Sequence, residues 1–236
     1  MVAATDRVRR MLPPSIRRQV GVLRRRYALS RAVSRLRRGA ATPAIFEALA
    51  FGWGNRGWTP PASYLSAVVS RLEACPGPVL ECGSGLTTLL LGVLAERRGF
   101  RVWTLEHDAQ WADRIVRALR RHSLRNVTVV RAPLVDREAY AWYDVRNVAL
   151  PPHFDTVICD GPPGSTRGGR FGLVPELHDR LPVGCVCFLD DAGRSGEQAI
   201  VHEWCATWGW SAVPQGSESS FAVLRRTSGG SAPRHQ

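Results

Sequence analysis

The stretch Val79-Leu-Glu-Cys-Gly-Ser-Gly-Leu-Thr-Thr88 decides the fold. It runs from a short apolar segment, through two closely spaced glycines, into a segment of helical character. Gly83 and Gly85 let the backbone turn tightly and approach a ligand closely. In an open parallel sheet, ligands bind at the carboxyl ends of the strands. The stretch therefore predicts a first strand, a ligand-binding turn and a helix that follows it.

The segments around this stretch repeat the alternation of strand and helix. Short apolar runs predict strands at 79–82, 101–106, 127–131, 154–159 and 184–189. Helical stretches fall between most of them, at 87–98, 109–122 and 172–181. After a helix at about 195–208, strands at 210–214 and 220–226 are joined by Gln215-Gly-Ser-Glu218, which predicts an antiparallel hairpin. The pattern indicates an α/β protein with a seven-stranded, mostly parallel sheet and helices on both faces.

Acidic residues stand at or near the ends of three of these strands. Glu81 comes just before the glycine turn, Glu106 ends the second strand and Asp160 follows the fourth. A carboxylate at the position of Glu106 can accept two hydrogen bonds from the hydroxyls of a ribose. The acids and the glycines together predict a nucleoside-containing ligand.

At these residues, over about 60–226, the sequence resembles the Rossmann-like class I S-adenosylmethionine-dependent methyltransferases. The resemblance implies S-adenosylmethionine as cofactor, with Glu81 near its methionine end, Glu106 on the ribose, and His107 and Leu134 beside the adenine. The cofactor-binding residues that it implies are Glu81, Cys82, Gly83, Gly85, Thr87, Glu106, His107, Leu134 and Asp160. Thr87 replaces the small residue often found there. A nicotinamide-dependent Rossmann enzyme shares the glycine turn, but it usually has an apolar residue at the position of Glu81.

The acceptor is predicted to lie near three carboxylates. Asp160 follows the fourth strand, and Asp190 and Asp191 end the fifth, so that all three would meet at one edge of the sheet. Clustered carboxylates need a cation. One interpretation is Mg²⁺ bound by Asp160, Asp190 and Asp191, an arrangement similar to metal-dependent O-methyltransferases. The alternatives are that the pair at 190–191 caps the next helix, or that Arg170 or Arg194 neutralises the cluster.

The catalytic residues are predicted to be Asp160, Asp190 and His107, and His178 is a further candidate for the base. The chain has no lysine, so no lysine can serve as the base. Asp160 is followed by Gly-Pro-Pro rather than Pro-Pro-Tyr, which argues against an amide-like nitrogen as acceptor. The arginines of the loop 166–170 could clamp an acidic acceptor. Trp53 and Trp58 could stack on an acceptor or pack the N-terminal helices on the domain.

Basic residues concentrate at the N-terminus. Residues 1–40 hold 12 arginines and one aspartate, whereas the other 196 residues carry a net charge of only +1. Apolar residues between 7 and 38 recur with helical spacing. The chain therefore divides into a basic amphipathic helical arm (1–40), a helical lead-in or lid (41–78), a methyltransferase domain (79–226) and a disordered tail (227–236).

The leading functional hypothesis is O-methylation of a small-molecule or sugar hydroxyl. One alternative is an RNA methyltransferase that uses the arginine-rich arm to hold phosphates, although the nearly neutral domain makes nucleic acid a weaker prediction. Another is a non-catalytic membrane-associated binding protein. Residues 7–38 could contact an anionic membrane surface. Six scattered cysteines and the lack of an apolar signal segment predict a cytoplasmic protein, peripheral to the membrane if the arm binds lipid.

Overall fold

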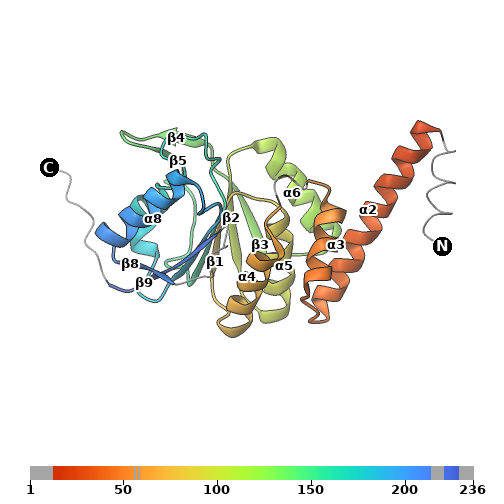
Figure 1. The fold of residues 1–236 in the computed structure, drawn as a ribbon, viewed down its shortest axis with the longest axis horizontal. Helices are drawn as coiled ribbons and strands as arrows, with labels where there is room; N and C mark the ends of the chain where they lie inside the picture. Colours follow the sequence, from red (N-terminus) through yellow and green to blue (C-terminus); the bar gives the residue numbers. More distant parts are fainter. Residues whose placement is uncertain (1–12, 56, 58, 214–220, 229–236) are drawn as a thin grey trace.

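A computed structural model describes residues 13–55, 57, 59–213 and 221–228. Its main feature is a seven-stranded sheet in the order β3-β2-β1-β6-β7-β9-β8 (Figure 1). The strands are β1 (Val79–Cys82), β2 (Val102–Glu106), β3 (Val127–Arg131), β6 (Thr156–Cys159), β7 (Val186–Leu189), β8 (Trp210–Val213) and β9 (Ala222–Arg226). The first five strands in this order are parallel, and β9 is antiparallel to β7 and β8. The predicted sheet and its C-terminal hairpin are confirmed, although the turn at 215–218 lies outside the described residues.

Successive side chains along the strands point to opposite faces of the sheet, so each face has its own hydrophobic core. In β1, Val79 packs into one hydrophobic cluster and Leu80 into the other, as expected when successive side chains point to opposite faces. The first cluster is formed with helices α2 (Pro14–Arg37), α3 (Pro43–Trp53), α4 (Ala62–Ala74), α5 (Leu86–Arg98) and α6 (Ala109–Arg121). The second is formed with α7 (Leu173–Leu177) and α8 (Ser195–Thr207). Helices thus cover both faces.

The connection between β3 and β6 contains a small β-hairpin that the sequence pattern does not predict. Strands β4 (Leu134–Asp136) and β5 (Ala141–Tyr143) pair antiparallel, with Leu134 opposite Tyr143. Trp142 and Tyr143 are fully buried in the second cluster. The hairpin therefore covers part of this face and carries Tyr143 toward the edge where the parallel strands end.

Helix α2 is fixed to the domain by its C-terminal half. Leu29, Val33 and Leu36 are buried against α3 and α5. A Cβ added at Gly52 of α3 would lie only 2.6 Å from the backbone nitrogen of Leu29, so α3 and α2 touch backbone to backbone. The N-terminal half of α2 stands clear of the other elements (Figure 1). Residues 1–12 of the predicted arm and residues 229–236 of the predicted tail lie outside the described part of the chain.

None of the described helices combines the length and the apolar composition that crossing a bilayer requires.

Candidate active site

The glycine turn after β1 brings two loops together at the carboxyl edge of the sheet. Gly83 has a φ of +84°, a left-handed conformation that favours glycine. A Cβ at Gly83 would lie 3.0 Å from the backbone of Gly161, in the loop after β6. At Gly85 the same added atom would meet nothing within 4 Å. Gly83 thus permits a close contact between loops, and Gly85 leaves free space beside the turn.

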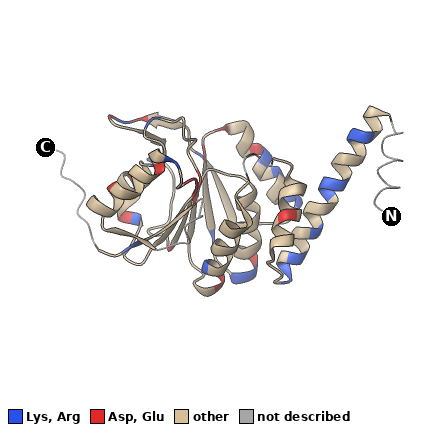
Figure 2. Cartoon of the chain, in the orientation of Figure 1, with Lys and Arg blue, Asp and Glu red and all other residues tan. Residues whose placement is uncertain are grey.

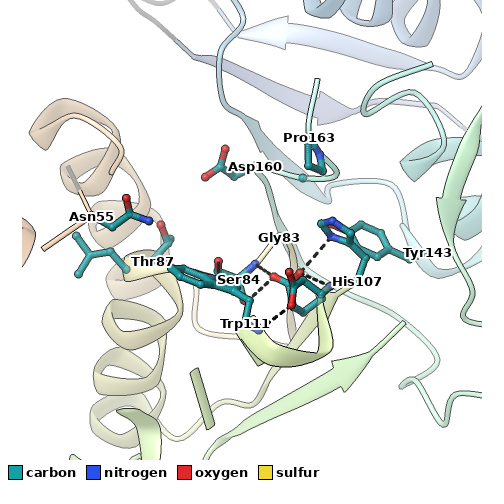
Figure 3. Close-up of a pocket in the computed structure, with 14 residues that line it drawn as sticks. Asn55, Gly83, Ser84, Thr87, His107, Trp111, Tyr143, Asp160 and Pro163 are labelled. Carbon is teal, nitrogen blue, oxygen red and sulfur yellow. Dashed lines mark hydrogen bonds and ion pairs between the residues drawn. The ribbon is translucent and has the colours of Figure 1, made fainter. Parts of the chain in front are cut away.

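A cavity of about 320 Å³ lies against this turn, within the range of small-ligand sites. Figure 3 shows Asn55 and Thr87 on one side of it, His107 and Tyr143 on the other, and Asp160 between them. It is lined by Asn55, Gly83, Ser84, Gly85, Leu86, Thr87, Glu106, His107, Asp108, Trp111, Tyr143, Asp160, Gly161 and Pro163. We call it the turn cavity. The sequence-predicted residues that it brings together are Gly83, Gly85, Thr87, Glu106, His107 and Asp160.

Glu106 is held rigidly at the turn cavity. Its Oε2 accepts hydrogen bonds from the backbone nitrogen of Ser84 at 3.1 Å and from the hydroxyl of Ser84 at 2.6 Å. Its Oε1 accepts one from the backbone nitrogen of Asp108 at 2.9 Å and lies 3.1 Å from Nδ1 of His107. The side chain is 4% exposed. The carboxylate is therefore oriented before any ligand arrives. Because Oε2 already accepts two hydrogen bonds, a ligand hydroxyl would bond at Oε1 or take the place of the Ser84 hydroxyl.

Glu81 lies beneath the turn and does not line the turn cavity. Its Oε2 accepts hydrogen bonds of 2.7 Å from the hydroxyls of Thr88 and Thr104. Burial raises the pKa of Glu81 to about 8, and the two threonine hydrogen bonds oppose that shift. Its Oε1 is buried without a hydrogen-bond partner among the described residues.

Aromatic residues join the N-terminal helices to the turn cavity. Trp111 of α6 donates a 2.8 Å hydrogen bond from Nε1 to the carbonyl of Ser84. Its ring lies edge-on to Trp53, with 6.0 Å between the ring centres. The guanidinium of Arg114 lies over both rings, 4.7 Å from Trp111 and 5.3 Å from Trp53. Of the two predicted tryptophans, Trp53 thus packs α3 against the site, and Trp58 lies outside the described residues.

Tyr143 is a site residue that the sequence pattern does not predict. It is fully buried, lines the turn cavity, and its ring centre lies 6.3 Å from that of His107. Its hydroxyl has no hydrogen-bond partner among the described residues. Burial raises the pKa of this phenol well above its ordinary value, so the hydroxyl remains a neutral donor. Ala141-Trp-Tyr143 is too short a run to reveal a strand that reaches the site.

A second cavity, of about 890 Å³, adjoins the first, and we call it the acid cavity. Asp160 and Pro163 line both cavities. The charged residues that line the acid cavity are Asp160, Asp190, Asp191, Glu197, Arg170 and Arg194. Burial and then the charge of Asp190 raise the pKa of Asp160 to about 7, while Arg170 opposes this shift. The carboxyl shared by the two cavities thus changes its charge near neutral pH.

Arg170 occupies the centre of the predicted metal site. Its Nη2 lies 3.1 Å from Oδ1 of Asp160 and 2.9 Å from Oδ2 of Asp191, and its side chain is only 2% exposed. Its Nη1 donates to the carbonyl of Asp190 at 2.5 Å and lies 3.4 Å from Oε1 of Glu197. No group of three acidic, histidine or cysteine residues in the described part of the chain could hold a metal ion. The predicted Mg²⁺ site at Asp160, Asp190 and Asp191 is therefore replaced by a buried guanidinium that neutralises the same charges.

The helix-cap interpretation of the acid pair is also wrong. Helix α8 begins at Ser195 with Arg194 as its N-cap residue, and no side chain caps it. Asp191 instead accepts from Arg170 and lies 2.8 Å from Nη1 of Arg194. Its φ of +59° turns the chain sharply after β7. This left-handed conformation is uncommon outside glycine, although aspartate tolerates it better than most residues.

The remaining sequence-predicted residues lie away from both cavities. Cys82 is buried within β1, and Leu134 lies in β4, opposite the Tyr143 that lines the turn cavity. His178 packs on the ring of Trp208 and contacts Arg226. Arg167, in the loop that was predicted to clamp an acidic acceptor, donates to Asp136 at 2.9 Å and so holds the β4–β5 hairpin.

Comparison with known proteins identifies the fold. No protein-family model and no curated protein sequence matches the chain. Among solved structures it is similar to the SAH-bound methyltransferase PaMTH1 of Podospora anserina, at 12% identity and a TM-score of 0.58, over 78% of this chain and 86% of that one. It is also similar to precorrin-6y C5,15-methyltransferase of Geobacter metallireducens GS-15, at 17% identity and a TM-score of 0.51, over 71% and 89%. The chain therefore has the class I methyltransferase fold.

Proposed function

We propose that the chain is an S-adenosylmethionine-dependent methyltransferase that methylates a hydroxyl group of a small molecule or sugar. The observation that carries this proposal is that Asp160 lines both cavities. One cavity holds the glycine turn and Glu106, and the other holds a separate group of charged side chains. Two ligands bound there would meet at Asp160, as a group transfer requires.

Three features of the described residues fit the cofactor in the turn cavity. The Glu106 carboxylate is oriented to accept from a ribose hydroxyl, at Oε1 or in place of the Ser84 hydroxyl. Gly85 leaves space where any other residue would place a side chain. Tyr143, which lines the same cavity, has a hydroxyl without a partner among the described residues that can donate to the ligand. When bound, S-adenosylmethionine supplies a methyl group on a positively charged sulfur.

Asp160 is the residue that we assign to the acceptor's proton. Its carboxyl is about one-third exposed at the junction of the two cavities. With a pKa of about 7, it is largely ionised at slightly alkaline pH and is still basic enough to accept a proton. As the acceptor oxygen forms its bond to the methyl carbon, the bond from sulfur to that carbon breaks and the hydroxyl proton passes to Asp160. Arg170 holds the carboxylate in place through its hydrogen bond to Oδ1.

The charges of the acid cavity favour an uncharged polyhydroxyl acceptor over a nucleic acid. Among the described residues, four carboxyl groups and two guanidinium groups line it, and the Arg170 guanidinium is already engaged by Asp160, Asp191 and Glu197. A phosphate-rich chain would meet unfavourable charges there. Carboxylates accept hydrogen bonds from sugar hydroxyls, so the same lining suits such an acceptor.

The direct test is methyl transfer from radiolabelled S-adenosylmethionine to a fractionated cell extract. The proposal expects label in a small-molecule or glycan fraction, and expects Asp160→Asn to abolish it. Label that resides mainly in RNA would contradict the assigned acceptor. A failure to label any fraction, together with a failure to bind the cofactor, would contradict the proposed function as a whole.

A further inference from the structure

Helix α2 carries apolar residues on two roughly opposite faces. Leu29, Val33 and Leu36 point into the domain and are buried. Ile16, Val20, Leu23 and Tyr27 form a second row, which we call the outer stripe. At about 3.6 residues per turn the two rows lie roughly 140° apart around the helix axis. The domain therefore accounts for only one of them.

The outer stripe is exposed over most of its length. Ile16, Leu23 and Tyr27 are 42%, 62% and 66% exposed, and none of them belongs to either hydrophobic cluster of the described residues. The C-terminal half of α2 is polar on this face, so the stripe is confined to about three turns. Single exposed apolar residues are ordinary, whereas a row of them on one helix face indicates a surface that contacts something.

The charge around the outer stripe has one sign. Residues 14–37 contain eight arginines and no acidic residue, and the basic residues recur along the whole helix in Figure 2. Arg17, Arg24 and Arg31 flank one side of the stripe and Arg26 flanks the other, and all four are exposed. Arginine can lay its aliphatic stem along an apolar surface while the guanidinium reaches outward to a phosphate.

We propose that the outer stripe and its flanking arginines are a docking surface for an anionic lipid bilayer. An interfacial helix buries its apolar side chains at the boundary of headgroups and acyl chains, and basic residues beside it bind anionic headgroups. A nucleic acid would satisfy the arginines but leave Leu23 and Tyr27 in water. A second copy of the chain would bring together two helices with eight arginines each, which repel one another.

The docking helix is held in place before it meets a membrane. The contact between Gly52 and Leu29 and the hydrogen bond from Arg37 to the carbonyl of His122 fix its C-terminal half. Arg31 donates a 3.3 Å hydrogen bond to the hydroxyl of Tyr27. The exposed half therefore extends from a fixed base, and membrane binding does not have to meet the cost of forming the helix.

The test is sedimentation of the full chain with phosphatidylcholine vesicles that contain or lack phosphatidylserine. We expect binding only when phosphatidylserine is present, and weaker binding as salt is added. Leu23→Ser combined with Tyr27→Ser should weaken the binding at least tenfold. Arg24→Gln combined with Arg26→Gln should weaken it about fivefold for each charge removed.

Matched variants elsewhere on the surface serve as controls. Val183→Ser removes an apolar side chain that is 61% exposed, and Arg117→Gln with Arg120→Gln removes two exposed charges from α6. These variants should bind vesicles nearly as the unaltered chain does. The proposal is overturned if vesicles do not bind, or if the stripe and control variants behave alike. It is also overturned if light scattering shows a dimer that the stripe variant dissociates, or if single-stranded RNA binds and vesicles do not. Vesicle binding requires no methyl transfer, so this result is independent of the proposed function.

Discussion

At the scale of single residues, Asp160 carries the chemistry because of where its carboxyl is placed. Burial and the neighbouring Asp190 raise its pKa to about 7, and Arg170 keeps it from rising further. A carboxyl that must be ionised to accept a proton gains activity as the pH rises through its pKa. We therefore expect the methyl-transfer rate to increase between pH 6 and 8 with a midpoint of about 7, and then to level off.

Asp160→Asn should lower the transfer rate by about 10²–10⁴-fold, the usual contribution of a positioned acid or base. It should also remove the midpoint near neutral pH. Asparagine has nearly the same shape, so S-adenosylhomocysteine should bind to the variant within a few-fold of its normal affinity. A variant that keeps both its rate and its pH profile would show that Asp160 is not the base.

Glu81 links the site to the stability of the fold. Its pKa of about 8 in the folded chain lies above the reference value of 4.5, so the folded state holds this proton more tightly than the unfolded state does. Its contribution to the free energy of unfolding is largest below about pH 4.5 and declines as the pH rises to about 8. Glu81→Gln does not ionise, and its amide oxygen can still accept from Thr88 and Thr104.

We expect Glu81→Gln to raise the free energy of unfolding by about 1–3 kcal/mol at pH 8 in the absence of ligand. The gain should shrink, or become a loss, at pH 5, where the native glutamic acid carries no penalty. Urea unfolding at both pH values measures this difference. Equal effects at the two pH values would contradict the assignment of a protonated, buried Glu81.

At the scale of elements, Arg170 joins the ends of β6 and β7 to the start of α8. Replacing it with methionine leaves the carboxyl groups of Asp160, Asp191 and Glu197 without their buried partner. We expect Arg170→Met to destabilise the fold by about 3–5 kcal/mol, as when one member of a buried ion pair is removed. Arg194→Met removes a partner of Asp191 that is 60% exposed, and should cost about 1 kcal/mol or less. Similar effects of the two substitutions in urea unfolding would contradict the central role of Arg170.

Substitutions at two glycines test the close packing of α2 on α3. A Cβ at Gly52 would lie within 2.7 Å of three atoms of Leu29, so Gly52→Ala must push the helices apart and should destabilise the fold by about 1–3 kcal/mol. Gly21 is interior to α2, and a Cβ there meets nothing within 4 Å. Gly21→Ala should therefore stabilise by about 0.5–1 kcal/mol. Thermal unfolding of both variants gives the comparison, and a stabilised Gly52→Ala would contradict the close contact.

The elements also show how far a sequence can be interpreted. The glycine turn, the position of Glu106 at the end of β2 and the terminal hairpin are predicted correctly, because short continuous apolar runs and strand-end acids are local signals. The β4–β5 hairpin and Tyr143 are not, because strands of three residues leave no periodic pattern. The cation at the centre of the acid cavity could not be predicted from the sequence either. Whether a metal or Arg170 neutralises Asp160, Asp190 and Asp191 depends on contacts that span 10 to 21 residues of chain.

At the scale of the whole molecule, the two proposed functions lie on different parts of the chain, which differ in charge and in exposed apolar surface. The sheet and its helices form a nearly neutral domain with the two adjoining cavities at one edge. The first half of α2 concentrates arginine and exposed apolar residues on a separate projection (Figures 1 and 2). The proposed catalytic site and the proposed membrane surface therefore share few residues, and each can be altered without the other.

The measurement that most directly tests the central claim is calorimetric binding of S-adenosylmethionine to the unaltered chain and to Glu106→Ala. We predict binding to the unaltered chain, and binding weakened about tenfold or more in the variant, because a hydrogen bond from the ribose to a charged group is lost. Arg101→Ala, an exposed residue beside the same strand, should bind normally. Absence of binding to the unaltered chain, or equal binding by Glu106→Ala, would contradict the assignment of the turn cavity to this cofactor.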